Sequence, residues 1–189
     1  MSGNSSDWRS QEVPLFALVA RLVHQKGVDL VIESAQAIVD AGGQIVVTGK
    51  GETRFEEALL QAQVRAPGSI AVKIGFHDAE ARKIFAGSDF TLMPSRFEPC
   101  GLSQMYAQRF GSLPIGHRTG GLAETIVDGE TGFLFDRASA PGFLGSLCRA
   151  FSTFGMKDRL DHMRRAAMAQ AFSWTQSAKS YATIYKSSI

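Results

Sequence analysis

Short apolar runs alternate with amphipathic segments along most of the chain. The run Leu15–Ala20 is continuously apolar, as expected of a strand that is covered on both faces. Residues Val28–Ala41 then repeat apolar side chains at helical spacing, and Gly42 and Gly43 end this predicted helix. The same apolar pattern predicts further strands at Gln44–Thr48, Ile70–Ile74, Phe90–Met93 and Leu113–Gly116, and a turn at Asp128-Gly129 leads to the apolar residues Phe133, Leu134 and Phe135.

Helical patterns separate these predicted strands. They lie at Thr53–Arg65, in a short segment capped by Asp78, at Gly101–Phe110 and at Leu122–Val127. From Pro141 onward the pattern is helical, with a stripe of Phe143, Leu144, Leu147 and Phe151, and a last helix near Trp174–Tyr185. Repeated strand–helix units predict an α/β fold: a Rossmann-like, doubly wound parallel sheet in three αβα layers.

The length of 189 residues, 44% of them hydrophobic, suits one compact domain, predicted at residues 13–189. Residues 1–12 are polar and are interpreted as a flexible linker or as residues foreign to the domain. They lack the cationic start and apolar run of a secretory signal, and no later segment approaches membrane-spanning length. We therefore expect a cytoplasmic protein with no membrane partner.

Net charge and cysteine content limit which binding partners and which covalent cross-links we expect. A net charge of +2, from 20 basic and 18 acidic residues, predicts no broad cationic surface for nucleic acid or anionic lipid. Any anion site must therefore be local. The two cysteines, Cys100 and Cys148, are expected to be free thiols, since a domain of this size needs no disulfide framework.

Ligands of doubly wound sheets bind beyond the carboxyl ends of the strands, so the loops after the strands are the candidates. The first loop carries Arg21 and Lys26, five residues apart. A guanidinium that forks onto phosphate oxygens and a compact ammonium charge together suit a diphosphate, and both could neutralise charge on a departing nucleotide. The alternative is an ordinary solvated pair of surface cations.

Two further loops carry weaker signals. Residues Thr48–Glu52 are glycine-rich but match neither a Walker A sequence nor the GxGxxG fingerprint, which argues against a P-loop nucleotidase and a nicotinamide dehydrogenase. A simple turn is the favoured interpretation there. Gly75 and Phe76 could offer backbone groups and an aromatic face to a nucleobase, although a core aromatic beside a surface histidine fits equally well.

The loop Pro94–Gln104 is the most informative. Pro99 biases Glu98 toward extended backbone and so holds its carboxylate at a strand tip, just before a predicted helix. Helix N-terminal amides near Gly101, Leu102 and Ser103 would face an anion there. A purely structural turn is the alternative.

The segments Ala20-Arg21-Leu22, Gln25-Lys26-Gly27, SRFEPCGLSQ, RTGGLAET and FSWTQSAKSY resemble bacterial-type glycogen and starch synthases, which are retaining GT-B glycosyltransferases of group 1. The resemblance runs from about Pro14 to the end, and SRFEPCGL is its most specific part. It implies the nucleotide-sugar-binding C-terminal half of a GT-B fold, with the N-terminal acceptor domain absent and this fragment inactive alone. It also implies ADP-glucose as donor, an α-1,4-glucan acceptor, retention of configuration, and no metal or other cofactor.

The resemblance also implies roles for individual residues. Arg21, Lys26 and Glu98 become the catalytic set, with the two cations on the donor diphosphate and the carboxylate on the glucose hydroxyls. It places adenine near Gly75 and Phe76, and the distal phosphate near the segment Cys100, Gly101, Leu102 and Ser103. The sequence agrees with metal-free chemistry, because it contains no Asp-x-Asp motif or comparable ligand spacing.

Two further positions distinguish glycogen and starch synthases from other GT-B glycosyltransferases. Tyr106 stands eight residues after Glu98, where the wider superfamily places a second glutamate, and this favours the synthases. The short turn Asp128–Phe133 instead resembles other members, so a UDP- or GDP-sugar transferase for lipid or surface glycans stays open. A donor-binding module without activity also stays open, whereas SRFEPCGL argues against an epimerase of GT-B shape.

Other expectations concern packing around the donor pocket. Gly120 and Gly121 are predicted to be close-packing positions beside it, and His117 is assigned no role. Trp174 and Tyr181 resemble residues of the family's terminal helices, which pack partly on the absent domain. We expect the exposed cleft face to carry apolar surface, through which the fragment could form a dimer.

Overall fold

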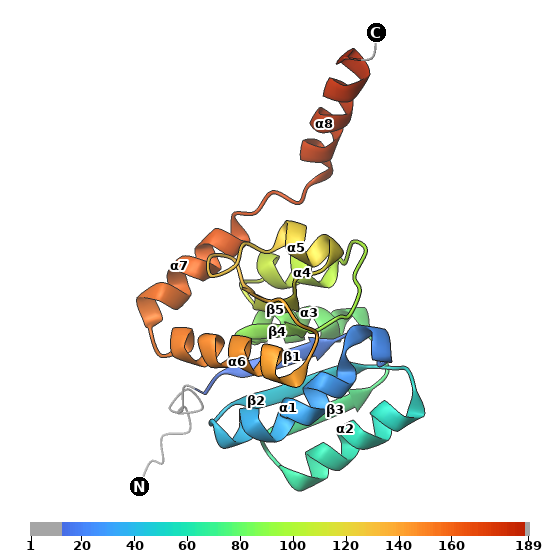
Figure 1. The fold of residues 1–189 in the computed structure, drawn as a ribbon, viewed down its shortest axis with the longest axis vertical. Coiled ribbons are helices and arrows are strands. Elements are labelled where there is room, and N and C mark those ends of the chain that lie inside the picture. The colour runs from blue at the N-terminus through green and yellow to red at the C-terminus, as the bar shows by residue number, and fades with distance from the viewer. Residues whose placement is uncertain (1–12, 188–189) are drawn as a thin grey trace, which may run out of the picture.

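The computed structural model describes residues 13–187, which form one parallel sheet between two layers of helices (Figure 1). The strand order is β3-β2-β1-β4-β5-β6, and every neighbouring pair is parallel. The strands are β1 (Leu15–Val19), β2 (Gln44–Gly49), β3 (Ile70–Ile74), β4 (Phe90–Met93), β5 (Leu113–His117) and β6 (Phe133–Phe135). The prediction of a doubly wound Rossmann-like sheet is confirmed.

Two sets of three helices cover the two faces of the sheet (Figure 1). One layer contains α1 (Val28–Asp40), α2 (Thr53–Arg65) and α6 (Ala140–Phe154), and the other contains α3 (Asp78–Gly87), α4 (Ser103–Arg109) and α5 (Gly120–Thr125). Helix α7 (Lys157–Met168) contacts both α4 and α6. Helix α8 (Trp174–Ser187) stands away from the three layers, and its Trp174 and Tyr181 are exposed.

The largest buried cluster joins the sheet to the layer of α1, α2 and α6. Phe16 on β1 stacks on Phe90 of β4 with ring centroids 5.2 Å apart, and both are fully buried. Of the predicted stripe on α6, Phe143 and Leu147 are buried and Leu144 and Phe151 pack partly buried against the same cluster. Strands β1, β4 and β6 are buried along almost their whole length because the sheet is covered on both faces, whereas the edge strand β3 has exposed Ala71 and Lys73.

The neighbouring strands β1 and β4 send the chain to opposite faces of the sheet. They pair at Phe16 with Phe90 and at Ala17 with Thr91. After β1 the chain enters the 3-10 helix η1 (His24–Lys26) and then α1, whereas after β4 it reaches α4 in the other layer. This divergence leaves a crevice at the carboxyl ends of β1 and β4, where doubly wound proteins bind ligands.

Two predicted helix starts are wrong. Helix α4 begins at Ser103 rather than Gly101, because Gly101 has a φ of 71° and the Gln104 side-chain amide donates to the Cys100 and Gly101 carbonyls. Asp78 does not cap α3: His77 holds the N-cap position and makes no side-chain cap bond. Asp78 instead pairs with a side chain one turn later, Arg82.

Smaller differences concern other boundaries. Helix α5 begins at Gly120, two residues before the predicted start, and η1 was not predicted. The helical pattern after Pro141 divides into α6 and α7, because the chain leaves the helix at Gly155 and Met156. The predicted end of α1 is confirmed, since the helix stops at Asp40 and Gly42 has a φ of 84°.

Replacing Gly27 by alanine should destabilise the fold at the divergence of β1 and β4. Gly27 has a φ of 68°, and a Cβ there would lie 2.1 Å from the Pro94 carbonyl oxygen. We expect the free energy of unfolding to fall by about 1–3 kcal/mol, measured by urea denaturation. As a control, Gly145→Ala in α6 meets nothing within 4 Å and should raise stability by about 0.5–1 kcal/mol. Equal effects of the two changes would contradict this packing.

Candidate functional site

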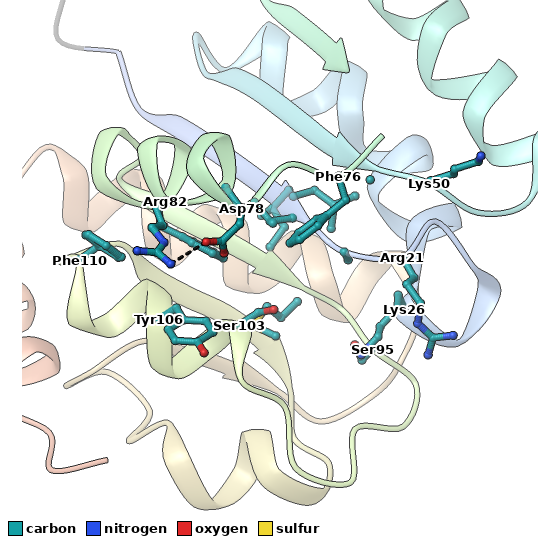
Figure 2. Close-up of a pocket in the computed structure, with 18 residues that line it drawn as sticks. Arg21, Lys26, Lys50, Phe76, Asp78, Arg82, Ser95, Ser103, Tyr106 and Phe110 are labelled. Atoms are coloured by element: carbon teal, nitrogen blue, oxygen red, sulfur yellow. Dashed lines mark hydrogen bonds and ion pairs between the residues drawn. The ribbon is translucent and has the colours of Figure 1, made fainter. Parts of the chain in front are cut away.

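A cavity of about 760 Å³ opens at the carboxyl ends of β1 and β4 (Figure 2). Its volume lies in the range of about 300–1,000 Å³ that is usual for small-molecule sites. Val19 and Met93, the last residues of the two strands, form part of its floor. The walls come from the loops after β1, β2, β3 and β4 and from helices α3 and α4.

One end of the pocket is cationic. Figure 2 shows Arg21, Lys26 and Ser95 together at this end, with Lys50 nearby and its amine turned away from the others. Arg21 and Lys50 are exposed, and Lys26 is partly buried. Cations from the loops after two strands thus lie at the divergence point, as the sequence suggested for Arg21 and Lys26.

Lys26 forms an ion pair with Glu98. Its Nζ contacts Glu98 Oε2, and the same oxygen accepts a hydrogen bond of 3.2 Å from Ser95 Oγ. The Lys26 side chain is 19% exposed and that of Glu98 only 7%. The carboxylate therefore lies behind the lysine and does not line the pocket itself, which sequence reasoning did not anticipate.

Close backbone contacts fix the loop that carries Glu98. The Gly121 amide donates to the Glu98 carbonyl at 2.9 Å. A Cβ at Gly120 would lie 2.1 Å from the Glu98 carbonyl oxygen, and one at Gly121 would lie 1.9 Å from that of Cys100. The predicted close-packing role of both glycines is confirmed. His117 bonds the Ser95 carbonyl through Nδ1 at 3.0 Å, so this nitrogen carries the proton.

The other end of the pocket is mainly aromatic, and the Asp78–Arg82 ion pair also lies there. Phe85 of α3 is buried there, and the exposed rings of Phe76, Tyr106 and Phe110 line its walls. In Figure 2 the cationic end and the end formed by Arg82, Tyr106 and Phe110 lie at opposite sides, with Phe76 and Ser103 between them. An elongated ligand with one anionic and one flat aromatic part matches this division.

The remaining predicted site residues divide into two groups. Phe76 and Ser103 line the pocket, whereas Gly75, Cys100, Gly101 and Leu102 do not. The backbone groups of Gly75 are already used, because its amide donates to Gly49 and its carbonyl accepts from Thr48 Oγ1. Since α4 begins at Ser103, the free first-turn amides belong to Ser103 and the two residues after it.

Sequence reasoning missed several pocket residues. Asp78 and Arg82, an ion pair on α3, and Lys50 line the pocket. Lys50 lies in the glycine-rich loop that was interpreted as a simple turn, so the glycines were the available signal. The sequence does not identify Phe85 and Phe110 as pocket residues, because an apolar residue in a helical pattern looks the same whether it packs in the core or lines a cavity.

A rim of apolar side chains surrounds this edge of the sheet. Phe76, Phe97, Leu102, Tyr106 and Phe110 are each more than two-fifths exposed. Exposed apolar side chains are thus present at this edge of the sheet, and that they form a cleft face toward another domain stays a prediction. Both cysteines are free thiols, as predicted.

Comparison with known proteins identifies the family. The sequence profile described as "Glycosyl transferases group 1" matches residues 5–152. The chain belongs to this family. A "Glycogen synthase 1" from Bradyrhizobium diazoefficiens is 68% identical over 173 residues, which are 92% of this chain and 37% of that protein. A "Glycogen synthase" from Pseudomonas putida is 54% identical over 93% of this chain and 34% of its own length. The chain thus spans about a third of these relatives.

Solved structures of glycosyltransferases share the fold of this group 1 domain. The catalytic domain of Starch Synthase IV from Arabidopsis thaliana, bound to ADP and acarbose, superposes with a TM-score of 0.84 at 32% identity. The match covers 98% of this chain and 40% of that one. Anabaena Alr3699/HepE in complex with UDP-glucose matches with a TM-score of 0.73 at 18% identity, over 93% of this chain and 49% of that one, which shows the fold alone. These neighbours confirm the expected GT-B relationship.

The described residues, 13–187, include no helix long and apolar enough to cross a membrane.

The acid limb of the stability curve should depend on Asp29. Burial acts to raise the pKa of this carboxyl, but hydrogen bonds and charge from Arg96, with His24 nearby, hold it below the ordinary value of 3.8. Because the folded pKa is lowered, the stabilisation is present above 3.8 and is lost as pH falls through the folded value. In Asp29→Asn, the free energy of unfolding should therefore fall less steeply than in the wild type as the pH drops below about 4.

This dependence is measured by urea denaturation between neutral pH and pH 3, with Asp161→Asn, an exposed position on α7, as the control. The control should follow the wild-type curve. A wild-type curve from Asp29→Asn would mean that the Arg96 contact does not contribute to acid sensitivity.

Proposed function

We propose that this chain is the donor-binding domain of a cytoplasmic retaining glucosyltransferase, which transfers glucose from ADP-glucose to the non-reducing end of an α-1,4-glucan. The observation that carries the proposal is the cationic end of the pocket, where Arg21 and Lys26 meet at the divergence of β1 and β4. The 68% identity to a protein named glycogen synthase and the 32% identity to an ADP-bound starch synthase support the choice of substrate.

In this proposal the nucleotide lies along the pocket. The diphosphate contacts Arg21, which is exposed and can fork two hydrogen bonds onto phosphate oxygens, and Lys26. First-turn amides of α4 near Ser103 approach the distal phosphate. The adenine lies beside Phe76, on the side of the pocket toward Tyr106, and both rings offer flat apolar faces.

The proposed chemistry needs stabilisation of a leaving diphosphate. The acceptor hydroxyl attacks on the face from which ADP departs, through an oxocarbenium-like state, and the leaving phosphate takes the hydroxyl proton. Arg21 and Lys26 neutralise the charge that develops on the phosphate, so no metal is required. Glu98 orients the sugar hydroxyls once the donor draws Lys26 away from it.

The acceptor site is proposed to lie outside this chain. Because the chain spans about a third of its curated relatives, the remainder of such a protein would supply the acceptor-facing wall and complete the enzyme. The apolar rim containing Phe97 and Leu102 would face that part, and so would the exposed side of α8. In isolation the same rim could pair two copies of the chain, and activity of the isolated chain is not expected.

Calorimetric titration with ADP, UDP and GDP tests the donor assignment. The chain should bind ADP most tightly, and Lys26→Ala should weaken ADP binding by about tenfold or more, since a charge-assisted contact of about 1.5–3 kcal/mol is lost. The matched control is Lys73→Ala, which removes a lysine that pairs with Glu80 outside the pocket. Preference for UDP or GDP would move the chain to another donor class.

The same titration tests the role of the cations in place of a metal. ADP affinity should be the same in excess EDTA as in buffer without added metal, because Arg21 and Lys26 supply the positive charge. A large loss of affinity on chelation would show that a bound cation carries the diphosphate instead.

A further inference from the structure

Arg96 joins the loop after β4 to the start of α1. Its Nη1 and Nη2 donate to Asp29 Oδ1 at 2.8 Å and Oδ2 at 2.5 Å. Nη1 also donates to the His24 carbonyl at 2.9 Å. One guanidinium therefore holds two points of a segment that lies about seventy residues earlier in the chain, and neither Arg96 nor Asp29 lines the pocket.

Backbone contacts reinforce this junction. The Arg96 amide donates to the Gln25 carbonyl at 2.9 Å, and Gln25 Nε2 donates to the Phe97 carbonyl at 3.1 Å. The segment 24–29 is thus tied to residues 96 and 97 from both sides. Lys26 lies within the first segment, and Glu98 directly follows the second.

The ion pair is electrostatically favourable despite partial burial. The side chains of Arg96 and Asp29 are 28% and 24% exposed. The hydrogen bonds that Arg96 donates to Asp29 raise the pKa of Arg96 against the opposing effect of burial. Both groups therefore remain charged throughout the neutral pH range.

We propose that Arg96 and Asp29 are positioning residues for donor binding: their bidentate ion pair holds the two backbone segments that carry Lys26 and Glu98 at the spacing that the diphosphate and the sugar require. This inference rests on the proposed function, in which Lys26 binds the diphosphate. It gives the arginine and the aspartate a role in affinity that is separate from their contribution to stability.

The geometry requires arginine at position 96. A lysine would keep the positive charge but provide a single donor centre, so it could not span both Asp29 oxygens and the His24 carbonyl together. Arg96→Lys therefore removes the planar fork and leaves the net charge unchanged. This makes it the most specific variant for the test.

A matched control lies at the opposite end of the sheet. Arg164 of α7 pairs with Asp89, which precedes β4 and also accepts from the Leu15 amide at 2.8 Å. These side chains are 31% and 19% exposed, close to the values for Arg96 and Asp29. Arg164→Lys makes the same chemical change in a partly buried ion pair away from the pocket, so any effect of an arginine-to-lysine change that does not depend on position should appear in both variants.

The first measurement needs no nucleotide. Brief acylation with an N-hydroxysuccinimide ester, followed by peptide mass spectrometry, compares the labelling rates of Lys26 and Lys50. In the wild type Lys26 should react more slowly than the exposed Lys50, because it is paired with Glu98. Arg96→Lys should raise the Lys26 rate toward that of Lys50, whereas Arg164→Lys should leave the ratio unchanged.

The second measurement is a double-mutant cycle of ADP affinity. Arg96→Lys should weaken ADP binding about fivefold or more, and adding it to Lys26→Ala should cost little further, because both act through one contact. Arg164→Lys should leave ADP affinity unchanged. If Arg96→Lys does not fold, Asp29→Asn replaces it, since that change retains the Arg96 bond to the His24 carbonyl.

The outcomes separate the two proposals. An unchanged Lys26 labelling ratio, or additive effects of Arg96→Lys and Lys26→Ala on affinity, would overturn the positioning role even if ADP binds as proposed. Preference for another nucleoside diphosphate would overturn the donor assignment. A raised Lys26 labelling rate in Arg96→Lys, and non-additive effects on affinity for the preferred nucleotide, would still support the positioning role. If no nucleotide binds, the proposed function and the role in donor binding both fail, and the labelling ratio shows only whether Arg96 holds Lys26 against Glu98.

Discussion

The divergence of the chain after β1 and β4 is the constraint on which the pocket depends. Two strands that pair side by side deliver Arg21 and Lys26 from one loop and Glu98 from the other to the same edge of the sheet. Parallel strands in this order bring loops together that are far apart in sequence. The Lys26–Glu98 ion pair spans that gap, so its geometry reports whether both loops are correctly placed.

Backbone contacts, more than side-chain packing, set how closely these loops approach. Gly27 lies against the Pro94 carbonyl, Gly49 against that of Ala20, and Gly121 against that of Cys100, each too close for a Cβ. Such contacts leave little freedom for the loops around the pocket. The backbone at the cationic end is therefore largely preorganised, which reduces the entropy lost when a ligand binds.

The elements that the sequence predicted well are those whose pattern is local. The strands are short apolar runs because the sheet is buried on both faces, and their bounds differ by at most one residue from the observed ones. The start of α4 was missed because the Gln104 side chain competes for the Cys100 and Gly101 carbonyls. The burial of Glu98 depends on Lys26, 72 residues away, and no local pattern reports such a contact. Arg21 and Lys26 were predicted because charged residues after a buried strand stand out, whereas Phe85 and Phe110 look like core residues.

The central claim is that the cationic end of the pocket binds the diphosphate of a nucleotide sugar. A crystal structure of the chain grown with ADP tests it most directly. The account predicts phosphate oxygens within hydrogen-bonding distance of Arg21 and Lys26, with Lys26 moved from Glu98 toward the phosphate and the adenine beside Phe76. A nucleotide bound elsewhere, or one in this pocket whose phosphates contact neither cation, would contradict it.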